Sequence, residues 1–181
     1  MPKPSHLFSL LVLNALPLIG VIAWDWQSFD LIFLYWLENL IIGAFTLLRM
    51  LIRPYRHAAD FVVALFFAPF FTFHYGMFCL AHGSFVFALF GPEDFAMQSF
   101  AGALLQIRPT LEGNHLGWAA LSLLLLQLVD WGRDVRRHGL GFDGIKTLML
   151  APYRRIIVLH VAILGSGFVL AALDEPVLGL A

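Results

Sequence analysis

The chain has 181 residues, of which 60% are hydrophobic and only 13% are charged, and its net charge is −1. Soluble domains carry about 25% charged residues, so the composition excludes an ordinary soluble domain and predicts one integral-membrane helical domain over residues 1–181. The near-neutral charge argues against a nucleic-acid partner. The single cysteine, Cys79, excludes an internal disulfide and a cysteine-rich metal site.

Five apolar segments are long enough to cross a bilayer, or nearly so, because a span needs about 20 mostly apolar residues. In chain order they cover about 7–24, 31–52, 61–90, 116–131 and 153–173. Pro17 is expected to kink the first segment, which we interpret as a retained helix and not a signal peptide. Pro69 is expected to tilt, bend or divide the third. The predicted fold is an all-α polytopic transmembrane bundle.

Residues 92–112 connect the third and fourth segments. Phe100, Leu104 and Ile107 recur at a helical spacing of i, i+4 and i+7, which favours a helix lying in the membrane interface. An ordinary connector with some apolar packing fits the same residues, so both interpretations stay open.

The distribution of positive charge predicts the topology. With five spans, the N-terminus and the loops at 53–60 and 132–152 share one side, which then holds every Lys and Arg except Arg108. Cytoplasmic loops are rich in Lys and Arg. We therefore expect a protein of the inner (plasma) membrane with its N-terminus in the cytoplasm and its C-terminus outside.

Glu38 is a carboxylate inside the second apolar segment, where an ionisable group costs a few kcal/mol and needs a partner. On a helix it falls close to one face with other polar or small residues, namely Tyr35, Asn39, Gly43 and Thr46. Such a stripe is expected to face other helices. It can serve hydrogen bonding between helices without chemistry, or it can present a ligand or proton-handling carboxylate.

The third segment carries His74, Tyr75 and His82. His74 and His82 are about 80° apart around an ideal helix, so binding one metal together requires a residue from another helix. Small residues of this segment, which suit close helix packing, share one face: Thr72, Gly76, Cys79 and Gly83.

A rise of about 1.5 Å per residue gives the expected depth of each polar group. Glu38 and His74 are expected at one level and form the predicted mid-membrane pair. His82 and His115 form the predicted outer pair. His160 is expected nearer the cytoplasm, because its helix is predicted to begin near residue 153.

These residues define the candidate sites. The candidate buried polar site contains Glu38, Asn39, His74, Tyr75, His82 and His160. The candidate metal ligands are Glu38, His74, His82 and His115, and imidazole with carboxylate suits zinc, iron or copper. Haem held by two histidines is an alternative if His74 and His160 reach one level. The sequence lacks a His-Glu-x-x-His pattern, which argues against a zincin.

The basic residues near the predicted inner surface suggest lipid contacts. Anionic head groups are expected to bind Arg136, Arg137, Arg154 and Arg155, although the same residues also fit simple surface anchors. The partners expected are therefore membrane lipids, with a second copy of the chain or a membrane subunit as further candidates.

Three polar motifs carry a resemblance to a known family. They lie at residues 35–43 (YWLENLIIG), at 73–78 with 81–83 (FHYGMF, AHG), and at 152–155 with 159–160 (PYRR, LH). The chain resembles a family of small bacterial integral-membrane proteins classed as a domain of unknown function, over about residues 10–173. The resemblance implies a multi-pass helical membrane protein and no established activity.

Two functions stay open on the sequence alone, whereas a transporter or channel fits least well, because the five spans show no repeat pair and few polar residues could line a path. The first is a membrane protein whose His/Glu site binds a metal or handles protons, with or without an enzymatic reaction. The second is a non-enzymatic subunit or scaffold whose buried polar residues only lock the packing of its helices.

Overall fold

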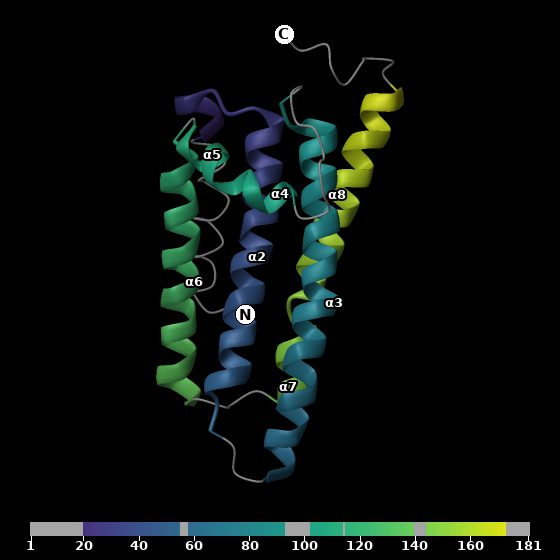
Figure 1. Ribbon diagram of the computed structural model, residues 1–181. Helices are drawn as coiled ribbons and strands as arrows, with labels where there is room; N and C mark the ends of the chain where they lie inside the picture. The colour runs from purple at the N-terminus through teal and green to yellow at the C-terminus, as the bar shows by residue number, and fades with distance from the viewer. Residues whose placement is uncertain (1–19, 55–57, 93–101, 114, 140–143, 173–181) are drawn as a thin grey trace, which may run out of the picture.

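A computed structural model of the protein describes residues 20–54, 58–92, 102–113, 115–139 and 144–172 (Figure 1). Every regular element within these ranges is a helix, which confirms the all-α prediction. The long helices are α2 (Ser28–Ile52), α3 (Ala58–Phe90), α6 (Leu116–His138) and α8 (Tyr153–Ala172). The short helices are α4 (Gly102–Leu105), α5 (Ile107–Glu112) and α7 (Ile145–Leu150).

Helix α2 lies between α6 on one side and the α3–α8 pair on the other (Figure 1). An ion pair between Arg49 and Asp134 joins the C-terminal ends of α2 and α6, while Leu116 packs in one core cluster with Trp26 at their N-terminal ends. These two helices therefore run in the same direction, and α3 and α8 run the opposite way. The short helices α4 and α5 lie at the end where α3 finishes and α6 begins.

Local chemistry explains where several helices begin and end. The Asp30 carboxylate accepts a hydrogen bond from the backbone N–H of Gln27 at 3.0 Å. This N–H precedes the first turn of α2 and has no partner within the helix backbone. Helix α2 ends at Ile52, and the next residue, Arg53, is extended because it precedes Pro54. Gly139 closes α6 with a positive φ of 78° and an N–H bond to the Val135 carbonyl.

Three segments in the described part of the chain are long and apolar enough to cross a membrane: Ser28–Ile52, Asp60–Phe90 and Ile145–Gly165. The first two agree with the predicted segments. Helix α6 has 23 residues but falls outside this group. Its C-terminal half carries Asp130, Arg133, Asp134, Arg136 and Arg137, which lower its hydropathy. Residues 7–19 of the predicted first segment, Pro17 among them, lie outside the described residues.

The last apolar segment begins about eight residues earlier than predicted, at Ile145 instead of 153. Helix α7 forms its first part, and Ile145 and Leu148 are buried against α2 and α3. Pro152 is buried at the junction, where the chain leaves α7 and starts α8. The prediction was wrong because the proline interrupts the helix without ending the apolar segment.

Pro69 does not divide α3, which is a single helix from Ala58 to Phe90. Residues 102–112 form two short helices, separated at Gln106, instead of one interfacial helix. Ala103 of α4 is buried against the bundle, whereas Leu104 is 40% exposed. Phe100 lies outside the described residues. The described part of this region therefore packs as a connector.

Candidate polar site between α2, α3 and α8

A group of polar side chains connects α2, α3 and α8 near the middle of the bundle. We call it the polar cluster; it contains Glu38, Asn39, His74, Tyr75, His82, Tyr153, Arg155 and His160. Three segments are long and apolar enough to span a membrane, and their midpoints are Leu40 in Ser28–Ile52, Tyr75 in Asp60–Phe90 and Arg155 in Ile145–Gly165. The cluster residues Glu38, Tyr75 and Arg155 therefore lie at or near these midpoints.

Trp36 brings α2 and α3 close together beside the cluster. Its indole Nε1–H donates to the backbone carbonyl of Cys79 at 2.7 Å, and both residues are buried. A Cβ on Gly83 would lie 2.5 Å from Trp36 Cζ2, so only glycine leaves room for the indole there. Thr72 and Gly76, by contrast, lie outside this contact, since Thr72 is exposed and Gly76 has open space around it.

Tyr75 forms the second bridge between these helices. Its hydroxyl donates to the backbone carbonyl of Asn39 at 3.0 Å. The Asn39 side chain is 1% exposed, and its Nδ2 donates to the Tyr35 carbonyl at 2.8 Å. Asn39 Oδ1 is buried and has no hydrogen bond among the described residues. Because an unmatched buried acceptor is costly, a bound hydrogen-bond donor would be stabilised at this atom.

The stripe predicted on α2 is buried only in part. Asn39, Gly43 and Thr46 are buried against neighbouring helices, and the Glu38 side chain is 15% exposed. Tyr35 is 48% exposed.

Glu38 forms an ion pair with Arg155 of α8. The Arg155 side chain is 45% exposed, so the carboxylate is the more buried partner. This contact neutralises a charge in an apolar segment, as the sequence required. The predicted partner, His74, is occupied elsewhere.

His74 contacts Tyr153, the first residue of α8. Its Nδ1 is 2.8 Å from the Tyr153 hydroxyl, and its ring stacks on Phe70 with centroids 5.2 Å apart. Tyr153 also meets Tyr75 edge to face at 5.5 Å. The start of α8 is thus held against the middle of α3.

His82 and His160 form a directly hydrogen-bonded pair, with His82 Nε2 3.0 Å from His160 Nδ1. His82 is buried, and its Nδ1 is 2.7 Å from the Phe78 carbonyl oxygen. A carbonyl only accepts, so His82 Nδ1 carries a hydrogen. In the neutral pair His82 Nε2 is then the acceptor, and His160 donates from Nδ1. The Nε2 of His160 is then left without a hydrogen, and His160 is an exposed residue.

These contacts correct the predicted depths. His160 meets His82 rather than lying nearer the cytoplasm, because α7 adds length below α8. His115 is not the partner of His82; it begins α6 and lies 5.6 Å from the Trp24 ring. The predicted pairing of His74 with His160 does not form either.

The predicted metal ligands are not brought together. Among the described residues, no group of three or more His, Cys, Asp or Glu side chains is arranged to hold a metal ion. Glu38 pairs with Arg155, while His82 faces His160. Haem between His82 and His160 would need their nitrogens about 4 Å apart, twice a metal–imidazole bond, and the observed distance is 3.0 Å.

The four arginines predicted to bind lipid head groups do not share one level. Arg136 and Arg137 are exposed near the end of α6. Arg154 and Arg155 lie at the middle of the segment Ile145–Gly165, and Arg155 is engaged with Glu38. The two pairs therefore belong to different parts of the molecule.

Sequence reasoning missed Tyr153 and Arg155 as members of the cluster. Both lie near residue 153, where the last apolar segment is predicted to begin, so neither is expected at the centre of that segment. The apolar residues Ile145 and Leu148, spaced i and i+3, were the signal that the segment starts earlier.

These observations define a class: an all-helical protein with three apolar helical segments of membrane-spanning length and a polar cluster at their centre. The sequence profile of a family described as "family of unknown function (DUF6498)" matches residues 2–181, so the chain belongs to this family. The expected resemblance to a family of unknown function is confirmed. No curated protein and no solved structure matches the chain.

Proposed function

We propose that this protein is a multi-pass membrane protein that stores one proton at the His82–His160 pair, within two of its apolar segments. The single observation that carries the proposal is the direct contact of two imidazoles at 3.0 Å within apolar segments. Histidine is the side chain that ordinarily gains and loses a proton near neutral pH, and ionisable groups within a membrane mark functional sites by default.

The hydrogen-bond pattern gives the route of the proton. A proton binds first at His160 Nε2, because this is the one nitrogen of the pair that lies outside the contacts at 2.7 and 3.0 Å and carries no hydrogen. His160, the more exposed ring, then holds the charge and donates its Nδ1 hydrogen to His82 Nε2 across 3.0 Å, so the neutral His82 stabilises the imidazolium as an acceptor. The other nitrogen of His82 is bound to the Phe78 carbonyl, which takes no proton. The proton therefore stays within the pair and leaves again from His160 Nε2.

The ion pair of the cluster limits the net charge next to the two histidines. Glu38 and Arg155 neutralise each other, so this ion pair adds no net charge next to the stored proton. A second proton would place two positive charges on adjacent rings in a medium of low dielectric constant, at a high Coulomb cost. The pair is therefore expected to hold one proton and not two.

Counting protons tests this proposal. Purified protein is titrated between pH 8 and pH 5, and proton uptake is compared with that of the double variant His82→Gln/His160→Gln. We expect the double variant to bind about one proton fewer, because the pair titrates as one coupled unit. His115→Gln, which removes a single exposed histidine outside the cluster, is the control for the loss of an imidazole that does not belong to the pair.

A difference of two protons would show two independent histidines and contradict the proposal. A difference of zero would mean that the pair stays neutral and favours the alternative, a scaffold whose polar groups only join helices. The observation behind that alternative is that Trp36 and Tyr75 each bridge α2 and α3 without any titration. A metal retained by the wild type and lost in the double variant would instead support the predicted metal site.

The proposal includes the location expected from the sequence: the bacterial inner membrane, with the N-terminus in the cytoplasm. The ion pair between Arg49 and Asp134 supports this topology, because it joins two basic helix ends at one side of the bundle. Lys and Arg are enriched on the cytoplasmic side of membrane proteins.

A further inference from the structure

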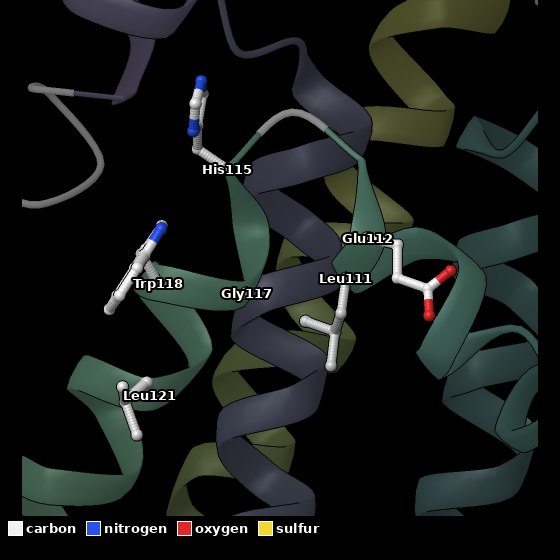
Figure 2. A pocket seen from close by; sticks show the side chains of 6 residues that line it. All are labelled: Leu111, Glu112, His115, Gly117, Trp118 and Leu121. Carbon is white, nitrogen blue, oxygen red and sulfur yellow. The ribbon is translucent and has the colours of Figure 1, made fainter.

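An open groove lies between α5 and α6, away from the polar cluster. It has a volume of about 480 Å³ and is lined by Leu111, Glu112, His115, Gly117, Trp118 and Leu121. Figure 2 shows Leu111 and Glu112 coming from α5, and Trp118 and Leu121 from the first turns of α6. A volume of 300–1,000 Å³ is typical of sites for small ligands.

Two backbone features shape the groove. His115 adopts a left-handed conformation, with φ of 60°, and turns the chain sharply into α6. Gly117 forms the floor, where an added Cβ would lie 3.1 Å from the Leu111 carbonyl oxygen. The absence of a side chain at Gly117 lets α5 lie close to α6 and leaves the space above open.

The groove lies at the end of the bundle where α2 begins and α3 finishes. Leu116 of α6 shares a core cluster there with Trp26 and Phe87. Trp24 lies beside His115, and Trp118 is 68% exposed in the groove wall. Tryptophans gather at the boundary between hydrocarbon and water, so the groove is placed where lipid head groups meet acyl chains.

We propose that this groove binds an amine-bearing, zwitterionic phospholipid such as phosphatidylethanolamine. Leu111, Trp118 and Leu121 provide an apolar wall for an acyl chain. At the rim, His115 provides a donor for the phosphate. Glu112 provides a carboxylate for the ammonium group: its Oε1 accepts from Arg108 Nε at 2.9 Å, and its other oxygen serves the lipid. The pairing with Arg108 gives this part of the rim no net charge, which suits a zwitterionic head group better than an anionic one.

A competition experiment tests this site. The full-length protein in mild detergent is offered equal amounts of palmitoyl-oleoyl phosphatidylethanolamine and phosphatidylglycerol, and retained lipid is counted by native mass spectrometry. We expect one retained phosphatidylethanolamine and a preference of about fivefold over phosphatidylglycerol, as one favourable charge contact would give. Glu112→Gln should reduce that preference to about one. Both lipids carry the same acyl chains, so the comparison isolates the head group.

Filling the groove provides the second arm. Leu121→Trp, at a position 42% exposed in the groove wall, should abolish retention of phosphatidylethanolamine. Leu125→Trp, one turn further along α6 and outside the groove, should leave it unchanged. Both positions are exposed, so neither variant is expected to disturb the core. Equal retention of the two lipids by the wild type, or full retention by Leu121→Trp, would overturn the proposal.

Discussion

Arg155 and Glu38 are opposite charges at the centre of apolar segments, and each is costly there without the other. Removing one partner of a buried pair leaves an uncompensated charge, while replacing both by apolar groups is often tolerated. Here the arginine is half-exposed, so the penalty falls mainly on the buried carboxylate.

A double-mutant cycle measures this coupling. We expect Arg155→Met alone to destabilise the protein more than the double variant Glu38→Leu/Arg155→Met, with a coupling energy of about 1–3 kcal/mol. Thermal unfolding of the purified variants in detergent gives the required stabilities. If the effects of the two single changes simply add, Glu38 and Arg155 do not interact.

Gly83 and Gly76 form a matched pair of positions on α3. Alanine at Gly83 would collide with Trp36 and should cost about 1–3 kcal/mol, as overpacking does. Alanine at Gly76 meets nothing within 4 Å, so Gly76→Ala should be neutral or stabilise the helix by about 0.5–1 kcal/mol. Unfolding midpoints of the two variants test this directly; equal losses would exclude the close approach of Trp36 to Gly83.

At the scale of single residues, the sequence predicted that Glu38 needs a partner but did not identify that partner. A carboxylate in an apolar helix requires a partner, and that requirement follows from Glu38 alone. The identity of the partner depended on the level of Arg155 relative to Glu38. That level depends on where another segment begins, which local sequence specifies poorly.

Helix α7 holds the start of the last apolar segment against the bundle. Leu148 is 8% exposed and packs in one cluster with Met50 and Ile156, whereas Leu150 is 49% exposed. Leu148→Ala should therefore destabilise the protein by about 2–4 kcal/mol through the lost contacts and the cavity.

Leu150→Ala, in the same short helix, is the control and should change stability by less than about 0.5 kcal/mol. The measurement is again thermal unfolding in detergent. Similar losses for both variants would mean that α7 does not pack through Leu148, and the level of Arg155 would then lack its structural basis.

The elements differ in how well the sequence predicted them. Helices α2 and α3 are long uninterrupted apolar segments, and their existence and type were predicted correctly. The break at Pro152 was taken for the boundary of an apolar segment, although it is only a change of helix. A proline reveals an interruption of hydrogen bonding, but it does not tell whether the chain has left the apolar layer.

In the molecule as a whole, the antiparallel arrangement of α3 against α2 and the parallel arrangement of α3 with α8 bring the polar groups together. Tyr75 of α3 lies against Asn39 of α2 and against Tyr153 of α8. His82 and His160 lie seven residues beyond Tyr75 and Tyr153, a rise of about 10 Å along each helix. The composition predicted an all-helical bundle. Predicting the contact between His82 and His160 requires the relative depths of α3 and α8. The periodicity of residues along one helix gives no information about these depths.

The shared proton of His82 and His160 is tested most directly by NMR of the protein in lipid bilayers with ¹⁵N-labelled histidine. We expect a scalar coupling across the hydrogen bond between His82 Nε2 and His160 Nδ1, absent from His160→Ala. Over the range in which the pair gains its proton, both rings should respond together as one coupled unit. Two rings without this coupling, each titrating independently, would contradict the account.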